Sequence, residues 1–252
     1  MARLWPRESY VAGGGAAKVA LIALSSVRLP DPLPVSRRAH GMPDEGDGPD
    51  AVTLVARDRA DDPAWFADQV IAPFTELVTS DLGESAAAIA AAAEYAYVIE
   101  AQLADPDDLG HLQAAWALAK CVCEEGATIV IDVYAARAYH GSEVAILSPE
   151  RPFDVMNEVT LFFEEQGDGR VAAWSLGMCK FGRPDLVLVD IAPDAATDAA
   201  LLLRDVAATL AAGERIEPGD EIAASGRTLT ATTFEPSSHP VVALDGPAIL
   251  LA

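Results

Sequence analysis

Residues 174–186 (WSLGMCKFGRPDL) join two predicted strands and constrain the fold of this chain more than any other segment. Its two glycines permit backbone conformations or close approaches that a side chain would prevent, and Pro184 fixes the entry to the second strand. The segment therefore predicts a rigid junction between a β-hairpin and the next strand. A binding loop is the alternative, because Lys180 and Arg183 are clustered cations beside aromatic side chains and suit an anionic ligand or a partner carboxylate. The candidate binding residues are Trp174, Met178, Lys180, Phe181, Arg183 and Asp185.

The glycine spacing of this segment matches that of a phosphate-binding P-loop, so that function has to be tested. A P-loop needs Lys and then Ser or Thr after its second glycine, and it opens into a helix whose amides hold phosphate. Here Arg183-Pro184 follow Gly182, and a strand comes next. The metal-binding hydroxyl and the helix are both missing, so we reject a P-loop. The other glycine cluster, Gly13–Gly15, lacks the Rossmann spacing and is expected to be a flexible turn.

Hydrophobic periodicity divides the chain into strand–helix units followed by strands in series, which predicts an α+β fold: a layered mixed or antiparallel sheet with helices packed on it. The clearest helix is expected to begin with Asp105 as its N-cap and to end at Gly126. Another helix is expected after Asp62, with Pro73 bending or ending it. For 95–101 a strand is expected, and a continued helix is the alternative. The other expected elements are strands at 19–24, 52–56, 128–133, 158–164, 170–176, 186–191, 228–234 and 241–244, and helices at 85–93 and 194–212.

Residues 36–50 have almost no apolar content and several Gly and Pro, which is typical of a loop or a disordered linker. We therefore expect residues 1–50 to form an N-terminal strand plus a flexible linker, packed on or tethered to the main domain. Residues 51–252 are expected to form a single α+β domain. Residues 1–40 carry six basic and two acidic side chains, so this segment can lie against an acidic body.

The net charge of −22, from 17 Lys and Arg against 39 Asp and Glu, bounds the class of partner. Such a surface repels phosphate backbones and anionic lipid, so we expect no nucleic acid and no membrane surface among the partners. The charge has two interpretations: it keeps the protein soluble, or it forms an acidic face for a basic protein partner.

The residues that could carry catalysis are scattered. Cys121 and Cys123 lie on a helix with their sulfurs about 200° apart, which suits neither a shared metal nor a disulfide and predicts two small core residues. His140 and Glu143 make the nearest approach to a metal pair. A triad of His111 or His140 with Asp132 is not indicated, and no serine lies in a G-x-S-x-G elbow. We therefore expect no catalytic residues, no metal and no cofactor.

The compartment follows from the cysteines and the N-terminus. Three cysteines without a framework spacing give no hint of disulfides, and the apolar run from Val19 to Leu24 is too short for a signal peptide. No stretch approaches the ~20 apolar residues of a membrane span. We expect a soluble, reduced, cytoplasmic protein.

The arrangement Gly177-Met178-x-x-Phe181-Gly182-x-Pro184-Asp185 after a β-hairpin resembles the C-terminal signature of a group of uncharacterised bacterial proteins, the domain-of-unknown-function family 4261 and its relatives. The resemblance covers residues 50–235. Where such proteins often have Thr-Arg before the Gly-Met pair, this chain has Ser175-Leu176. The resemblance implies an α+β fold and no established activity.

These observations favour a non-enzymatic protein-binding module. The alternative is an enzyme or small-ligand sensor whose pocket is lined by residues 174–186 and the end of the 129–133 strand.

Overall fold

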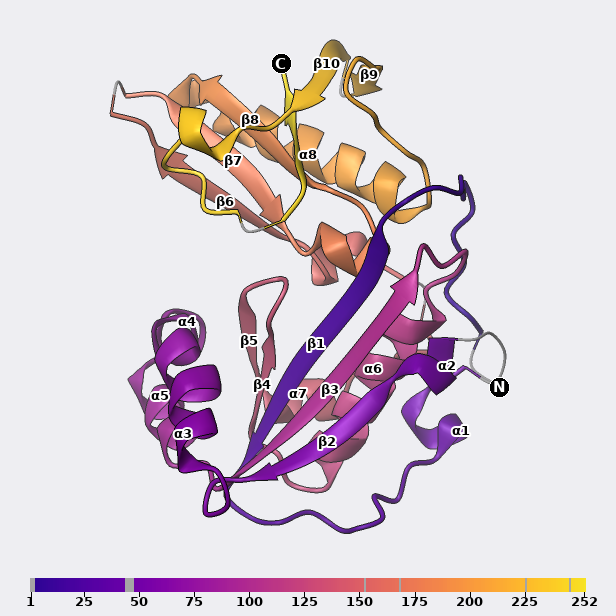
Figure 1. The fold of residues 1–252 in the computed structure, drawn as a ribbon, viewed down its shortest axis with the longest axis vertical. Coiled ribbons are helices and arrows are strands. Elements are labelled where there is room, and N and C mark those ends of the chain that lie inside the picture. Colours follow the sequence, from indigo (N-terminus) through magenta and orange to yellow (C-terminus); the bar gives the residue numbers. More distant parts are fainter. Residues whose placement is uncertain (1–2, 44–47, 152, 168, 225, 245) are drawn as a thin grey trace. The chain divides into compact units, whose positions relative to one another are not determined.

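The computed structural model describes residues 3–43, 48–151, 153–167, 169–224, 226–244 and 246–252. They form two compact units. Unit 1 contains the residues up to Trp5, Lys18–Leu103 and Asp108–Phe153, and unit 2 contains Pro6–Ala17, Ala104–Asp107 and Asp154–Ala252. Each unit has its own sheet with helices beside it (Figure 1). The structure thus confirms an α+β fold with layered, mixed and antiparallel sheets.

The sheet of unit 1 has five strands in the order β2-β3-β1-β4-β5. The pairs β1–β4, β2–β3 and β4–β5 are antiparallel. The N-terminal strand, expected as an addition to a main domain, is the central strand of this sheet. The expected boundary at residue 50 stays a prediction, because compact units show which residues pack together and not which fold alone. The strands are β1 (Ala16–Ser25), β2 (Thr53–Asp58), β3 (Tyr95–Ala104), β4 (Ile129–Asp132) and β5 (Arg137–His140).

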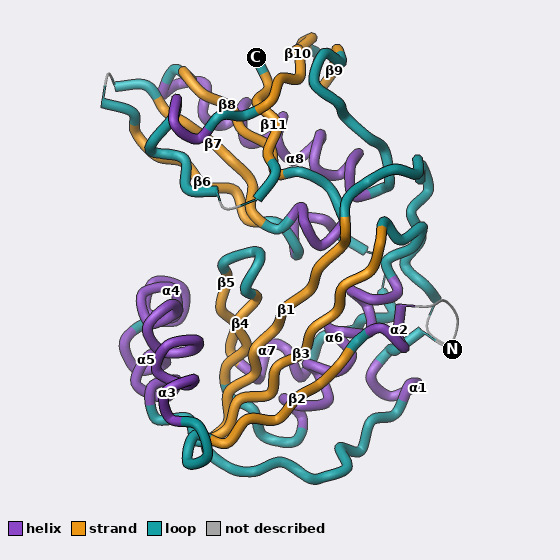
Figure 2. The backbone as a smooth tube through the Cα atoms, viewed as in Figure 1, coloured by secondary structure: helices purple, strands orange, loops and turns teal. Residues whose placement is uncertain are grey.

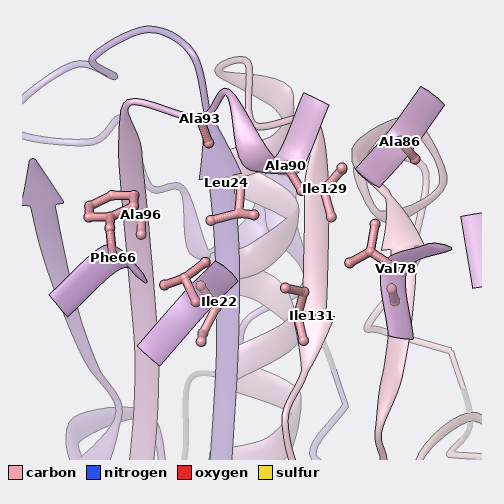
Figure 3. Packing of buried hydrophobic residues seen from close by; sticks show 12 residues of the cluster. Ile22, Leu24, Phe66, Val78, Ala86, Ala90, Ala93, Ala96, Ile129 and Ile131 are labelled. Atoms are coloured by element: carbon pink, nitrogen blue, oxygen red, sulfur yellow. The ribbon is translucent and has the colours of Figure 1, made fainter. Parts of the chain in front are cut away.

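One face of this sheet carries the core shown in Figure 3. Ile22 pairs with Ile131 in the register of β1 and β4, so both side chains point to the same face. Phe66, 1% exposed, packs there from α3. Each such large apolar side chain contributes roughly 1.5–3 kcal/mol on full burial. The helices on this face are α3 (Pro63–Phe66), α4 (Ala72–Leu82) and α5 (Glu84–Ala91).

A turn of π-helix, Ala67–Ile71, joins α3 to α4, so Pro73 does not end the helical run and lies in the first turn of α4. The amide of Ala72 donates to the carbonyl of Ala67, five residues back. This wider turn comes just before the proline, which has no N–H to give. Asp62 caps the start of α3 as expected, since its carboxylate accepts the amide of Trp65 at 3.1 Å.

The opposite face of the unit 1 sheet is covered by α6 (Gly110–Glu124). Trp116 of α6 meets Tyr139 of β5 edge to face, with ring centroids 5.6 Å apart. Cys121 and Cys123 are buried in this helix, as the sequence predicted for core residues. Gln113 ties other segments to it: its amide nitrogen donates to the carbonyls of Arg3 and Pro149, both at 3.0 Å. The short helices of this unit are α1 (Arg37–His40), α2 (Gly48–Ala51) and α7 (Gly141–Ala145).

Two of these short helices lie where a loop or disordered linker was expected at 36–50, so that expectation is wrong for part of the segment. Ser36 caps α1, because its hydroxyl accepts the amide of Ala39 at 3.2 Å, and the buried His40 closes the helix. Caps of this kind need only one well-placed oxygen and little apolar content. Residues 44–47 lie outside the described part of the chain.

Unit 2 contains a six-stranded sheet in the order β6-β7-β8-β11-β10-β9, with β11 parallel to β8 (Figure 2). Helix α8 (Ala196–Ala211) packs on β7 and β8. The predicted hairpin is present: β6 and β7 pair antiparallel, and the amide of Gln166 donates to the carbonyl of Arg170 at 2.6 Å. The strands are β6 (Thr160–Glu165), β7 (Val171–Leu176), β8 (Asp185–Ile191), β9 (Glu221–Ala224), β10 (Arg227–Thr233) and β11 (Ala248–Leu251).

The last part of the chain corrects the expectation of a strand at 241–244. In that run Val241 lies in a turn and residues 242–244 have no regular secondary structure, and the final strand is β11, after Pro247. The apolar side chains that suggested a strand are used in packing: Val242 is buried beside Trp174 and Phe234 on one face of the unit 2 sheet. Apolar character therefore marked burial here and not strand pairing.

Candidate functional site

The 174–186 segment connects β7 to β8 through one turn of 3₁₀-helix, Met178–Phe181. Gly177 and Gly182 flank this turn with φ angles of 116° and 63°, in the left-handed region that favours glycine. A Cβ atom on Gly182 would lie 2.4 Å from the carbonyl oxygen of Gly15. The segment thus has the geometry of the tight junction that the sequence predicted, with an additional close backbone approach at Gly182.

Arg183 is the most extensively hydrogen-bonded side chain of the segment, and it is 4% exposed. Its Nη1 atom donates to Oδ1 of Asp105 at 2.7 Å. Its Nε and Nη2 atoms donate to the carbonyls of Glu214 at 2.9 Å and Gly213 at 2.8 Å. Further bonds reach the carbonyls of Val11 and Gly182, both at 3.2 Å. The guanidinium fork is therefore used within unit 2.

Asp105, which accepts the bond from Nη1 of Arg183, has a φ of 35°, in the left-handed region that is uncommon for residues other than glycine. Its Oδ2 atom accepts the amides of Gly13 at 2.7 Å and Gly14 at 2.8 Å, and the hydroxyl of Tyr10 at 3.1 Å. Burial alone would raise the pKa of Asp105, but the hydrogen bonds from Arg183 and from the Gly14 and Gly13 amides lower it to about 2. The carboxylate is therefore ionised at neutral pH, and its oxygens accept hydrogen bonds from donors of the same chain.

This arrangement corrects two expectations. Asp105 does not cap α6, which begins at Gly110 after Asp108 has accepted the Gly110 amide at 2.7 Å. Gly13 and Gly14 form an anion-binding concavity of consecutive amides around a carboxylate of the same chain, where a flexible turn was expected. A Cβ atom on Gly14 would lie 1.7 Å from Nη1 of Arg183, so that position requires glycine.

A second cation lies beside this cluster. Arg7 is buried, and its Nη1 atom donates to the carbonyl of Pro106 at 2.8 Å, 3.9 Å from Oδ1 of Asp105. Loss of hydration by burial, and then the like charge of Arg183, lower the pKa of Arg7 to about 10. The guanidinium remains charged at neutral pH, so two arginines share one aspartate.

Lys180, the other cation of the candidate set, is fully buried. Its Nζ atom donates to Oε2 of Glu158 at 2.7 Å, and Glu158 is itself 3% exposed. Two opposite charges held in the interior require each other, because either one alone would be a desolvated charge. The ammonium group that suggested an anion site therefore has a carboxylate of the same unit as its partner.

Asp185 is a buried carboxyl in a different environment. Its Oδ1 atom accepts the Ser175 hydroxyl at 3.0 Å and the Met178 amide at 3.2 Å. Burial raises the pKa of Asp185 to about 6, although these two hydrogen bonds oppose the shift. The Ser175 oxygen in turn accepts the amide of Leu186 at 2.9 Å. Ser175 and Asp185 thus join the two strands at the junction.

The remaining candidates are apolar packing residues. Trp174 is 4% exposed and stacks on Phe162, with ring centroids 5.7 Å apart. Met178 and Phe181 are both fully buried. The structure thus brings all six candidates into one junction and buries them. The sequence did not indicate the partners of these side chains, namely Asp105, Glu158, Ser175, Tyr10 and Arg7.

The other residues considered for chemistry lie in unit 1. His140 and Glu143 form a capping box at the start of α7, where the His140 amide donates to Oε2 of Glu143 at 3.1 Å. This explains their spacing without a metal. His111 is fully buried in the first turn of α6, and Asp132 is fully buried at the end of β4. Within the described ranges, no group of three His, Cys, Asp or Glu side chains is placed to hold a metal ion.

Along the described part of the chain, no helix combines the length and the apolar character that crossing a bilayer requires.

Comparison of the chain with protein-family models, with curated proteins and with solved structures finds no match. The resemblance to family 4261 therefore stays a prediction that depends on the residues of the 177–185 signature.

Proposed function

We propose that this chain is a non-enzymatic, cytoplasmic protein-binding module that recognises a basic protein through its acidic surface. The observation that carries the proposal is the placement of charge in unit 2. This unit contains seven Lys and Arg and 19 Asp and Glu in its sequence. Three of the seven cations, Arg7, Lys180 and Arg183, are buried. Only four basic residues remain to balance the outer carboxylates.

Because more cations than carboxylates are buried, the surface of unit 2 has a larger excess of negative charge than the composition of the unit alone would give. Buried Glu158 and Asp185 remove two carboxylates from the surface of unit 2, against three cations. A surface of one sign attracts a partner of the opposite sign and increases the rate of encounter, in a manner that salt screens. The cysteines accord with a reducing compartment, since Cys121 and Cys123 are buried free thiols. Burial raises the pKa of the Cys121 and Cys123 thiols to about 11 and about 12.

Affinity capture tests the proposal. The full chain, immobilised at low density, is exposed to a lysate of its source organism at about 50 mM and about 500 mM salt. We expect a basic protein to be retained at the lower salt concentration and released at the higher one. Added salt shortens the distance over which exposed charges interact, from about 10 Å near 0.1 M to about 3 Å near 1 M. A matched acidic control protein of similar charge identifies retention by charge alone. Recovery of no protein beyond that control contradicts the proposal.

A thermal-shift screen over nucleotides, metal ions and metabolites separates the proposal from a small-ligand sensor. A ligand present at one hundred times its Kd adds about 2.7 kcal/mol to stability, which is a readily measured shift. The side chains of the 174–186 segment already have partners or packing neighbours inside unit 2. We therefore expect no stabiliser in the screen, and one reproducible stabiliser would overturn the proposal in favour of the sensor.

A further inference from the structure

The Asp105 carboxylate lies among donors that come from other segments of unit 2. Its Oδ2 atom accepts the amides of Gly13 at 2.7 Å and Gly14 at 2.8 Å, and its Oδ1 atom accepts Nη1 of Arg183 at 2.7 Å. The Tyr10 hydroxyl lies 3.1 Å from Oδ2 and 2.9 Å from the carbonyl oxygen of Asp105, so its one proton is shared between them. None of these donors belongs to the 104–107 segment. They therefore form a site that is separate, along the chain, from the side chain that fills it.

The arrangement of the donors suits the two oxygens of a carboxylate. Consecutive backbone amides form a concavity for an anion, and a guanidinium adds a charge-assisted hydrogen bond. Both glycines are needed for this approach. Gly13 has a φ of 101°, and a Cβ atom on Gly14 would lie 2.4 Å from Oδ1 of Asp105. The backbone thus encloses a group of this size and charge closely.

The site also contains more buried positive charge than Asp105 neutralises. The side chains of Arg183 and Arg7 are 2% and 0% exposed, and Nη1 of Arg7 lies 3.9 Å from Oδ1 of Asp105. The Nε atom of Arg7 is buried, and no described residue is its hydrogen-bond partner. Asp107, a second carboxylate that acts on Arg7, is exposed. Two buried cations around one carboxylate strongly favour an anion at this position.

Asp105 fills the site at a cost in backbone free energy. Its φ of 35° is one that glycine adopts readily and that other residues adopt only when their surroundings impose it. Burial alone would raise the pKa of Asp105, but the bonds from Arg183 and from the Gly14 and Gly13 amides lower it to about 2. The contacts of the carboxylate therefore hold the backbone of Asp105 in a strained conformation.

We infer that the Gly13 and Gly14 amides, Arg183 and Arg7 form a carboxylate-binding site, and that Asp105 is a tethered ligand that closes this site in the free chain. The ligand class is a monocarboxylate of the size of acetate, because acetate reproduces the aspartate side chain beyond its Cα atom. The contact is autoinhibitory, since an external carboxylate enters only when Asp105 leaves. The inference goes beyond the proposed function, which concerns the outer surface of the protein.

The variant Asp105→Gly opens the site for a direct test. Glycine adopts the φ of this position without strain, and acetate replaces the atoms that the substitution removes. NMR of the full chain follows the Gly13 and Gly14 amides during titration with sodium acetate, and sodium chloride keeps the ionic strength constant. We expect saturable shifts at both amides with a Kd of about 10 mM or tighter, which a ligand of four heavy atoms can reach. No saturable change at either amide overturns the proposal.

Thermal unfolding gives a second readout, which also serves a variant that folds poorly. Acetate that binds only the folded Asp105→Gly chain raises its Tm, whereas chloride at the same concentration should not. If the variant is unfolded in buffer, trimethylamine N-oxide favours its folded state, and the same comparison is made in that osmolyte. An acetate effect no greater than that of chloride, in the medium where the variant folds, contradicts a carboxylate site.

Two matched controls separate binding at this site from effects of acetate elsewhere. Acetamide has the shape of acetate without its charge and should bind Asp105→Gly at least tenfold more weakly. Asp105→Asn keeps the site filled by a neutral side chain of the same shape, so its Gly13 and Gly14 amides should show no saturable response to acetate. Equal responses of the two variants would place the acetate at another position and would refute the assignment.

The unaltered chain tests whether Asp105 closes the site. A tethered carboxylate competes at a high effective concentration, so acetate should cause no saturable change at Gly13 or Gly14. This expectation accords with the absence of a stabiliser expected in the ligand screen. A response equal to that of Asp105→Gly would show an open site and would overturn the role of Asp105. Capture of a basic protein is a separate result, so the proposed function and this inference can fail independently.

Discussion

Arg183 donates from Nη1 to Oδ1 of Asp105 at 2.7 Å, although the two residues are 78 positions apart in the sequence. The pair joins the β7–β8 junction to the 104–107 segment, and the Gly13 and Gly14 amides complete the carboxylate's coordination. The cation that most suggested an external ligand is thus satisfied by the chain itself.

The substitution Arg183→Lys should destabilise the chain by roughly 2–4 kcal/mol in urea unfolding. Lysine keeps the charge but loses the planar fork, and buried carbonyls are left without donors. The control is Arg204→Lys, because Arg204 and Asp205 form an exposed pair at 3.4 Å, and such pairs contribute about 0–1 kcal/mol. Equal effects of the two substitutions would show that the Arg183 bonds contribute no stability of their own.

Gly14→Ala should destabilise the protein by roughly 2–4 kcal/mol, since its Cβ would meet the Arg183 guanidinium at 1.7 Å and Oδ1 of Asp105 at 2.4 Å. The guanidinium is held by several bonds and cannot move aside. Gly15→Ala is the matched control, because its nearest contact would be at 3.6 Å, and a change within about 0.5 kcal/mol is expected. Thermal or urea unfolding measures both, and a harmless Gly14→Ala would contradict the described geometry.

Lys180→Met should cost about 3–5 kcal/mol, because it leaves the Glu158 carboxylate buried without its cation. The double variant Lys180→Met with Glu158→Leu removes both charges and should recover most of that loss. A double-mutant cycle from urea unfolding gives the coupling free energy of the pair. Additive single effects would contradict a direct interaction at 2.7 Å.

Asp185→Asn should stabilise the protein above pH 6. The folded chain raises the pKa of Asp185 from 3.8 to about 6, so the folded state binds the proton more tightly than the unfolded state. Stability from this group is therefore present below pH 4 and is lost as pH rises to about 6. Asparagine stays neutral and can keep both bonds to Oδ1, so we expect roughly 1–3 kcal/mol of gain at pH 7.5.

The pH dependence of unfolding in urea from pH 4 to 8 checks this prediction. The difference in stability between Asp185→Asn and the unaltered chain should grow through this range and level off above pH 6. Asp105 acts in a separate window: its pKa of about 2 stabilises the folded state above pH 4 and that contribution is lost as pH falls toward 2. A constant difference across pH 4–8 would contradict the shift at Asp185.

The secondary-structure elements that depend on the properties of their own residues could be predicted from the sequence. Strand β4 is rich in β-branched residues, and the start of α3 has Asp62 followed by proline. The glycine spacing likewise indicated a tight junction. Strand β5 was missed because it is short and polar, and it follows a turn in which Ala136 has a positive φ.

The partners of the candidate site could not be predicted, because they depend on long-range packing. Asp105-Pro106 has every local property of a helix start, yet its carboxylate binds Gly13, Gly14 and Arg183 instead. Lys180 looks like a surface cation until Glu158, 22 residues away, is placed beside it. Composition shows how many charges a chain has, and only the fold shows which ones remain outside.

Hydrogen exchange of the full chain, bound to the protein that it captures from the lysate, tests the central claim most directly. We predict that binding leaves hydrogen exchange in residues 174–186 as it is in the free chain, because the polar side chains of that segment already have partners inside unit 2. Protection confined to residues 174–186 would show that the junction is the binding site and would contradict this account.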